Sequence, residues 1–369
     1  MKKMIFTAAM MLASAVAMAQ SGTFQIKGNV EGLPDSLVAM IGRKTENIEV
    51  KKKKFEFSKN FDKPQWVYLC DQKVIKSGAF SAIPVFAIPS ETIEMKGNFT
   101  GGVDIKGGKF YQEQDLMDEY KGQAYKDIKA LWKWYSDNVN DSNRDSIEKV
   151  VDERMEPLQK KYAADLLAYA KQHSDQECIA LLIDELDDVK DKETLISLMA
   201  DNVKNGRMKA YYEPIFERAK KRAEMEEKAK VVQASGVEAP DFTLNDINGK
   251  PFSLSSLRGK YVVIDFWGSW CIWCIKGMPK MKEYYEKYKG KFEILGVDCN
   301  DTEAKWKAAV EKHQLPWIHV YNPKGSDVLD KYAVQGFPTK IVIGPDGKIV
   351  KTIVGEDPAF YTLLDEVLK

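Results

Sequence analysis

The chain has 369 residues, of which 44% are hydrophobic and 30% charged, with 55 basic and 55 acidic residues. This composition is too apolar for a disordered chain and too charged for a polytopic membrane protein, and the length suggests two or three domains. The absence of a positive excess gives no reason to expect a nucleic-acid partner, and five cysteines are too few for a disulfide scaffold.

The first residues have the pattern of an export signal. Two lysines precede the apolar run 4–17, and an Ala-Met-Ala sequence ends at Ala19. We predict that residues 1–19 are a signal peptide that is cleaved after Ala19. A membrane anchor is the alternative, but the run is shorter than the ~20 apolar residues that span a bilayer. We therefore expect a periplasmic protein without stable membrane insertion after cleavage, in a compartment where disulfides persist.

Residues 20–108 predict a β-rich accessory domain. Runs of alternating apolar and polar residues indicate short strands, and glycine, proline, aspartate and asparagine mark the turns between them. These runs are 23–30, 55–57, 66–69 and 92–95. Short strands with frequent turns are typical of a small β-sandwich or barrel. We interpret the lysine run 51–54 as a solvated hairpin edge and not as a basic binding patch, because lysine protects exposed strand edges.

Residues 109–230 predict a helical region. Glycine and proline are rare, and apolar residues recur at helical spacing, as in 166–170. The highly charged segment 213–230 is expected to be a helix with a solvated charged face that leads into the next domain. Cys70 and Cys178 are expected to be inert buried thiols, with a disulfide between them as the alternative. Nothing in these first regions is a cofactor or catalytic motif, and we expect no cofactor.

Residues 231–369 predict an α/β domain. Strands and helices alternate, and a hairpin and a final helix follow. The strands are expected at 261–267, 292–298, 317–321, 340–343 and 348–354, and the helices at 271–289, 302–313 and 358–368. This order is typical of an α/β layer fold. The expected fold class is therefore multidomain, with a small β domain, a middle helical segment and a C-terminal α/β domain.

Two cysteines at one strand-to-helix junction carry the predicted chemistry. Cys271 and Cys274 follow the turn formed by Gly268 and Ser269. Cysteines with two residues between them can close a disulfide across the first turn of a helix. The helix N-terminus favours a thiolate through its free N–H groups and its dipole. We expect Cys271 to be the nucleophile and Cys274 to be the resolving thiol.

Two other interpretations of the cysteine pair remain. A structural zinc site needs four ligands, and the further candidates Cys299, His313 and His319 have no paired spacing. A purely structural disulfide is the second alternative, although placement between a strand and a helix is typical of redox motifs. We predict no metal site, and we interpret Cys299 as a bystander thiol and not as a third redox cysteine.

Three motifs follow one another in the last domain. The segment 239–244 reads APDFTL, residues 262–274 contain the strand and the WCIWC sequence, and residues 336–339 read GFPT. Together they resemble the thioredoxin superfamily, specifically its exported TlpA/ResA-like branch, which also matches AhpC/TSA-type profiles. The resemblance covers residues 236–369. The preceding regions resemble, by layout alone, the accessory regions of Bacteroidetes periplasmic thioredoxin-like proteins.

The resemblance implies a docking surface beside the cysteines. Pro338 matches the cis-proline whose neighbouring backbone pairs with an extended substrate segment, and an ordinary turn proline is the alternative. Phe337, Trp270 and Trp273 are expected to contact the substrate. Trp273 stands between the cysteines, where reducing thioredoxins have a Gly-Pro pair, and it either selects apolar clients or covers the start of the helix.

The resemblance also implies a proton acceptor. Asp265 lies six residues before Cys271 on an apolar strand, and the matching aspartate of thioredoxins is buried and assists proton transfer at the resolving cysteine. We expect a raised pKa for Asp265 and a general-base role towards Cys274, with an outward-facing strand position as the alternative. ResA-like members often carry a glutamate three residues after the second cysteine, but Gly277 stands there in this chain.

These residues predict an enzyme, a thiol-disulfide oxidoreductase that reduces periplasmic proteins. Its partners would be protein disulfide clients, with cytochrome c maturation as one client class that the resemblance suggests, and a membrane thiol carrier as electron donor. A thiol peroxidase of the AhpC/TSA type is one alternative, although the sequence lacks a Pro-x-x-x-Thr-x-x-Cys run. A non-catalytic binding module on a thioredoxin scaffold is the other.

Overall fold

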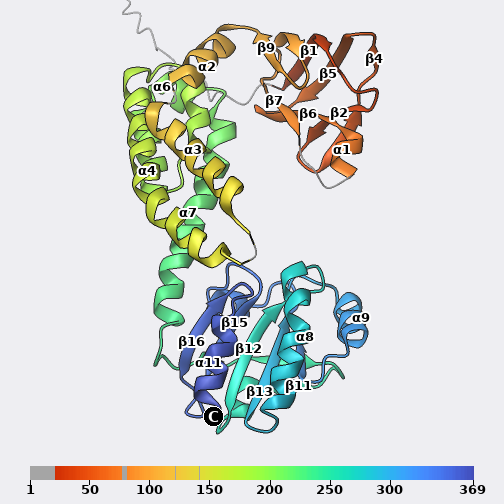
Figure 1. Ribbon diagram of the computed structural model, residues 1–369, viewed down its shortest axis with the longest axis vertical. Helices are drawn as coiled ribbons and strands as arrows, with labels where there is room; N and C mark the ends of the chain where they lie inside the picture. Colours follow the sequence, from red (N-terminus) through yellow and green to blue (C-terminus); the bar gives the residue numbers. More distant parts are fainter. Residues whose placement is uncertain (1–20, 77–80, 121, 141) are drawn as a thin grey trace, which may run out of the picture. The chain divides into compact units, whose positions relative to one another are not determined.

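A computed structural model describes residues 21–76, 81–120, 122–140 and 142–369. The predicted signal segment 1–19 lies outside these described residues. The chain divides into two compact units, Met1–Ala219 and Lys220–Lys369. In chain order, strands, then helices, then an α/β region follow one another (Figure 1), which confirms the predicted multidomain class. The predicted β-rich accessory domain and most of the predicted helical region belong to the first unit.

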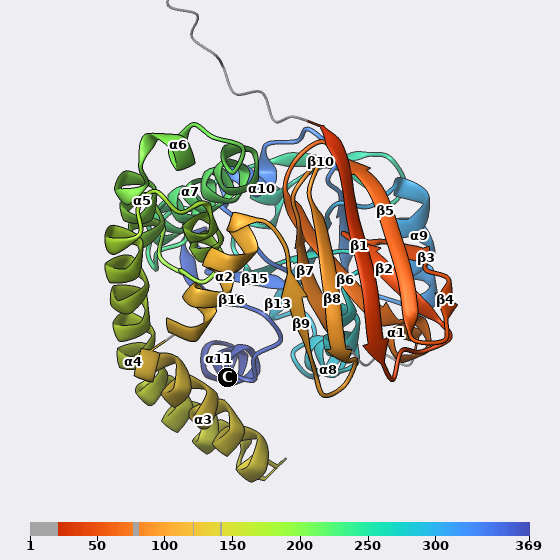
Figure 2. The same ribbon diagram turned by 90° about the horizontal axis from the view of Figure 1, so that it is seen from above.

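The first unit begins with two packed β-sheets. One sheet has the order β4 (Val50–Lys51), β5 (Lys54–Phe61), β1 (Gly22–Glu31), β8 (Thr92–Asn98) and β9 (Gly102–Lys106). The other has the order β3 (Lys44–Asn47), β2 (Leu37–Ile41), β6 (Gln65–Asp71) and β7 (Ala82–Ala87), and the short helix α1 (Gln72–Lys76) follows β6. Phe24 and Ile26 from one sheet share a core with Val67 and Leu69 from the other, so the two sheets form the sandwich seen in Figure 2.

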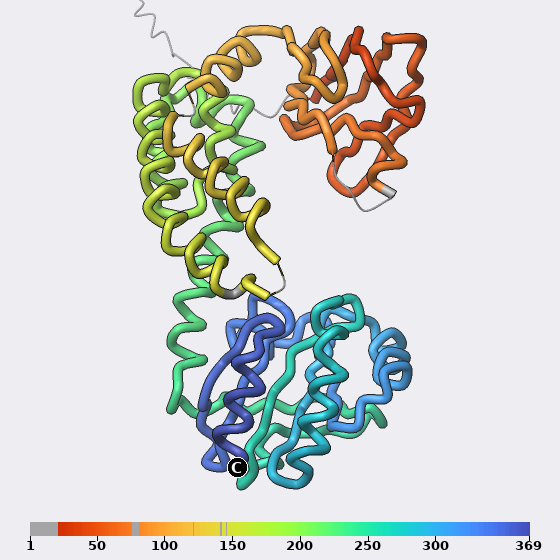
Figure 3. The backbone as a smooth tube through the Cα atoms, in the orientation of Figure 1, coloured from red at the N-terminus to blue at the C-terminus, as the bar shows by residue number. Residues whose placement is uncertain are grey.

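Helices make up the rest of the first unit. They are α2 (Lys109–Tyr120), α3 (Gly122–Asn138), α4 (Arg144–Gln172), the 3-10 helix η1 (Glu177–Ile183), α5 (Val189–Leu198), α6 (Asp201–Lys204) and α7 (Lys209–Val232), which continues beyond residue 220. Helices α3 and α4 lie side by side (Figure 3) and enclose a small apolar cluster that includes Leu131, Val151 and Met155. Among the described residues, no helix combines the length and the apolar character that crossing a membrane requires.

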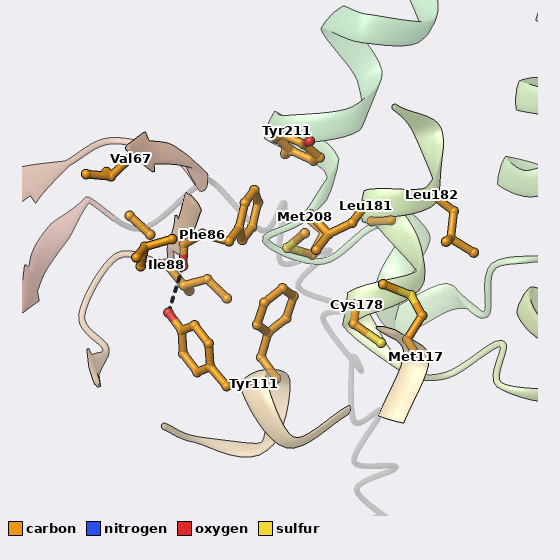
Figure 4. Packing of buried hydrophobic residues seen from close by; sticks show 14 of the residues in the cluster. Val67, Phe86, Ile88, Tyr111, Met117, Cys178, Leu181, Leu182, Met208 and Tyr211 are labelled. Carbon is orange, nitrogen blue, oxygen red and sulfur yellow. Dashed lines mark hydrogen bonds between the residues drawn. The ribbon is translucent and has the colours of Figure 1, made fainter. Parts of the chain in front are cut away.

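Phe86 connects the sheet that contains β7 to the helices of the first unit through contacts between aromatic rings. Phe86 of β7 is 1% exposed, and its ring stacks on Phe110 at 5.5 Å between centroids. Tyr211 of α7 meets the same ring edge-on at 4.8 Å. The hydroxyl of Tyr111 donates to the Phe86 carbonyl oxygen at 2.9 Å (Figure 4). Strand and helices therefore share one continuous core.

The two cysteines of the first unit are free and buried. The alternative of a Cys70–Cys178 disulfide is therefore wrong. Cys178 lies in η1, within the core drawn in Figure 4, and burial raises its pKa to about 12. A thiol that stays protonated at neutral pH is a poor nucleophile, which agrees with the predicted inert role.

The second unit is built on a seven-stranded mixed sheet. Its order is β11 (Pro251–Ser253), β10 (Thr243–Asp246), β14 (Ile318–Tyr321), β13 (Phe292–Asp298), β12 (Tyr261–Trp267), β15 (Thr339–Ile343) and β16 (Ile349–Val354). The helices are α8 (Ile272–Lys287), α9 (Glu303–His313), α10 (Val328–Lys331) and α11 (Ala359–Val367), with the 3-10 helix η2 (Leu254–Leu257). Strands β12, β13 and β14 are parallel, and antiparallel strands extend the sheet on both sides, β15 and β16 next to β12 and β10 and β11 next to β14. The predicted strand 261–267 has these bounds in the structure.

The sheet of the second unit separates two cores. Residues of α8, α9 and α11 pack against one face together with Val263 and Trp267 of β12. The alternate β12 residues Val262, Ile264 and Phe266 face the other core, which includes η2 and α10 residues. This alternation follows from the period-two geometry of a strand, and it decides which β12 side chains approach α8.

Replacing Phe86 by alanine tests the shared core of the first unit. Deleting a buried phenylalanine ring costs about 3–5 kcal/mol, so Phe86→Ala is expected to lower the free energy of unfolding of the first unit by that amount in denaturant titrations. Leu116 on α2 is 60% exposed, and Leu116→Ala is the matched control with almost no effect. Similar losses in both variants would contradict the assignment of Phe86 to this core.

Candidate active site

The turn between β12 and α8 is held in one conformation by its neighbours. A Cβ atom on Gly268 would lie 2.5 Å from Nε1 of Trp270 and 2.8 Å from the Cys299 carbonyl oxygen, so only glycine fits. The Asp301 carboxylate accepts the Ser269 backbone N–H at 2.7 Å and the Ser269 hydroxyl at 3.0 Å. These contacts fix the residues that precede the cysteine pair.

Cys271 and Cys274 form a disulfide at the start of α8. The sulfur atoms are 2.03 Å apart, and the two residues are 5% and 4% exposed. The helix begins at Ile272, one residue later than predicted, so Cys271 occupies the N-cap position. Its sulfur accepts the Cys274 backbone N–H at 3.2 Å. Free N–H groups at a helix start stabilise negative charge, so the reduced pair would have a stabilised thiolate at Cys271.

Exposed apolar side chains surround the cysteines in the sequence. Trp270, Ile272 and Trp273 are 52%, 62% and 58% exposed. Trp270 meets the Phe337 ring edge-on at 5.3 Å, and we call Trp270, Trp273 and Phe337 the aromatic rim. The Lys276 ammonium lies 4.4 Å from the Trp273 ring centroid. Solvent-exposed aromatic groups beside a reactive pair suit recognition of another apolar surface.

The Phe337–Pro338 peptide bond is cis. Pro338 itself is buried, and its carbonyl oxygen accepts the Gly355 backbone N–H at 2.8 Å. Phe337 packs against the core that contains Cys271 and Cys274. The structure therefore brings the Phe337–Pro338 loop, which the sequence places far from the cysteines, beside Trp270 at the start of α8.

Asp265 is buried on the face of the sheet that carries α8. It is 5% exposed and lies between Val263 and Trp267, which share a core with Cys274. The alternative of an outward-facing position is therefore wrong. Burial raises the pKa of Asp265 from 3.8 to about 6, an effect that nearby Lys340 opposes and Glu356 reinforces. Oδ1 of Asp265 has no hydrogen-bond partner among the described residues.

The structure places a carboxylate next to α8 that no sequence pattern had indicated. A Cβ atom on Gly277 would lie 2.2 Å from Oε2 of Glu356, a residue that follows β16. Lys340, opposite Asp265 in the β12–β15 register, donates to Oε2 of Glu356 at 2.8 Å. The available signals were a glycine inside a helix and a lysine within an apolar strand, but neither indicates its partner.

The remaining cysteine of the second unit is buried and free. Cys299 has no exposed surface, and its thiol donates to the Val297 carbonyl oxygen at 3.3 Å. Burial raises its pKa, which makes it a weak nucleophile at neutral pH. Within the described parts of the chain, no three His, Cys, Asp or Glu side chains lie close enough together to hold a metal ion.

The AhpC/TSA family model matches residues 235–352, which lie in the second unit. The thiol-disulfide oxidoreductase ResA of Bacillus cereus (strain ZK / E33L) is 43% identical over 122 residues, which are 33% of this chain and 70% of that protein. ResA of Bacillus subtilis (strain 168) is 36% identical over 123 residues, 33% of this chain and 68% of that protein. The thioredoxin domain of a thiol-disulfide oxidoreductase from Bacteroides vulgatus is 35% identical, with a TM-score of 0.35 over 37% of this chain and 99% of that structure.

The buried carboxyl group predicts a pH-dependent stability. Asp265 binds its proton more tightly in the folded than in the unfolded chain, so the stability that it confers is present below its unfolded pKa near 4 and is lost as pH rises through about 6. Asp265→Asn removes this loss and is expected to raise the free energy of unfolding at pH 8 by about 1–3 kcal/mol relative to its effect at pH 4. Denaturant titrations of the oxidised protein at both pH values measure the difference. An equal effect at pH 4 and pH 8 would contradict a raised pKa.

Proposed function

The chain belongs to the ResA-like thiol-disulfide oxidoreductases of the thioredoxin superfamily, and we propose that this member reduces disulfide bonds in exported proteins. The observation that carries the proposal is the Cys271–Cys274 disulfide at the N-terminus of α8, with the Cys271 sulfur at the helix cap. Such a pair can be closed and reopened at a position where the helix stabilises the attacking thiolate.

The proposed reaction passes two electrons from the cysteine pair to a client disulfide. The Cys271 thiolate attacks one client sulfur, forms a mixed disulfide and releases the second client sulfur as a thiolate. Asp265 takes the proton from the Cys274 thiol, and the resulting thiolate attacks the Cys271 sulfur. The Cys271–Cys274 disulfide forms, the first client sulfur leaves as a thiolate, and both client thiolates take protons from Asp265 or solvent.

The client is proposed to bind as an extended segment along the aromatic rim. The cis Phe337–Pro338 loop lies next to Trp270, and its backbone would pair with the segment as in strand addition. The exposed rings of Trp270 and Trp273 would then bury apolar client side chains. This arrangement supports a preference for unfolded or partly folded proteins, whose disulfides lie in accessible extended chain.

Location and electron supply are part of the proposal. The signal pattern of residues 1–19, with cleavage after Ala19, supports export to the periplasm. Each reduction leaves the cysteine pair oxidised, so a continuing reaction needs a donor, for which we propose a membrane thiol carrier. Cytochrome c maturation is a client class that fits an exported reductase of this kind.

Serine variants test the order of attack. Cys274→Ser cannot resolve the mixed disulfide and is expected to accumulate a covalent adduct with a disulfide-containing protein such as insulin, seen as a mass shift on non-reducing gels. Cys271→Ser should form no adduct, and Cys299→Ser, which changes a buried thiol, is the control with normal activity. Adducts on Cys271→Ser, or rapid peroxide consumption by the reduced protein, would favour another function.

An aromatic-rim variant tests client recognition. Trp273→Ala is expected to lower kcat/KM for peptides with apolar residues beside the disulfide by about 5- to 30-fold, the effect of losing one large interface side chain. The rate with a small polar disulfide should not change. Val231→Ala removes another exposed apolar side chain, 68% exposed on α7, and serves as the control. Equal losses on peptide and small disulfide would contradict a docking role for Trp273.

A further inference from the structure

Gly277 leaves space against α8 that a carboxylate fills. Gly277 is buried one helical turn after Cys274. A Cβ atom there would lie 2.2, 2.4 and 2.7 Å from Oε2, Cδ and Oε1 of Glu356. The Glu356 carboxylate therefore rests directly on the helix backbone, and any side chain at position 277 would displace it.

Both oxygens of this carboxylate are occupied. Lys340 donates to Oε2 at 2.8 Å, and the Tyr361 hydroxyl donates to Oε1 at 2.8 Å. The Lys340 side chain is 1% exposed and that of Glu356 is 20% exposed. An unpaired lysine so deep in the protein would be strongly unfavourable. Glu356 supplies its counter-charge and retains some contact with solvent.

The same lysine faces Asp265. Asp265 and Lys340 are directly opposite in the antiparallel β12–β15 pair, and opposite residues of such strands project to the same face. Val342, two residues after Lys340, packs in the core shared by Val263 and Cys274, which places Lys340 on the α8 side. Lys340 lowers the pKa of Asp265 and Glu356 raises it, so both charges act on this carboxyl group.

We propose that the Lys340–Glu356 ion pair, seated against Gly277, is a positioning pair that makes Asp265 ready to accept the proton of Cys274. The inference rests on the proposed function, because it concerns the step in which Cys274 resolves the mixed disulfide. In this proposal, Lys340 and Glu356 act through Asp265 and not directly on the reacting sulfur atoms.

The pair has a clear physical purpose. Burial alone favours the protonated form of Asp265, which cannot accept a proton. A lysine without a second carboxylate nearby would stabilise the ionised form so strongly that Asp265 would not bind a proton. A lysine shared between two carboxylates gives Asp265 an intermediate affinity for its proton, suited to accepting and releasing a proton near neutral pH.

The titratable and charged groups around Asp265 are Lys340 from β15, Glu356 after β16, Tyr361 from α11, Cys299 after β13 and Cys274 from α8. Burial raises the pKa of Tyr361 and of Cys299, so neither changes charge in that pH range.

The test follows two sequential sulfur releases. The reduced mature protein is mixed with 5,5′-dithiobis(2-nitrobenzoate) in a stopped-flow instrument. Attack by Cys271 releases one thionitrobenzoate, and resolution by Cys274 releases the second. The rate of the second phase, recorded against pH, gives a midpoint that reports proton acceptance by Asp265. The first phase, which does not need Asp265, is the internal control.

The two partners are expected to shift this midpoint in opposite directions. Lys340→Gln removes the charge that favours the carboxylate and should move the midpoint to higher pH by about one unit. Glu356→Gln removes the opposing charge and should move it to lower pH by a similar amount. Gly277→Ala, which expels the Glu356 carboxylate, should follow Glu356→Gln, and Glu356→Asp, which keeps the charge, should stay near the wild type.

The outcomes separate this inference from the function on which it rests. A wild-type protein that never releases the second thionitrobenzoate would overturn the proposed function. A wild type with two phases, together with variants whose midpoints stay unchanged or move in the same direction, would overturn the role of the ion pair and leave the function intact. If Lys340→Gln does not fold because Glu356 loses its partner, Glu356→Gln and Gly277→Ala still test the role of the ion pair. A midpoint that moves to lower pH in both variants supports that role, and an unchanged midpoint overturns it.

Discussion

The position of Cys271 at the cap of α8 is the constraint on which the site depends. A buried parallel strand, β12, ends at Trp267, and the helix begins at Ile272. The intervening turn is fixed by Gly268, which alone fits against Trp270, and by Asp301, which binds Ser269. The Cys274 backbone N–H of the first helical turn therefore donates to the Cys271 sulfur atom at 3.2 Å, where it stabilises a thiolate. In the proposed function, the cis loop and the aromatic rim bind a client whose disulfide reaches this sulfur atom.

Burial of Asp265 links this reactivity to the stability of the domain. A carboxyl group in the core is costly when charged, and its raised pKa is the direct consequence. Lys340 reduces that cost and Glu356 adds to it, because one positive charge lies near two carboxylates. The domain thus retains an unfavourable group at the position of the proposed proton acceptor, as is usual for functional sites.

The second unit was predictable where the signal was local. Strand 261–267, the cysteine spacing and the alternation of helices and strands all lie within short segments, and the structure confirms them. The contact between Glu356 and Gly277 was not predictable, because it joins the turn after β16 to the interior of α8. The exclusion of a Cys70–Cys178 disulfide likewise needed the three-dimensional structure. In the first unit, period-two patterns identified individual strands, but their order in two sheets depends on long-range packing of residues such as Phe86.

The proposed function requires that Cys271 and Cys274 form a redox-active pair that acts as a reductant. The most direct measurement is equilibration of the mature protein with dithiol/disulfide buffers of known potential, followed by counting the free thiols of Cys271 and Cys274. We expect a reversible two-electron transition with a midpoint on the reducing side, near the value of about −270 mV found for thioredoxin. A midpoint between about −180 and −120 mV would make the protein an oxidant or isomerase, and a pair that never opens would contradict the catalytic role altogether.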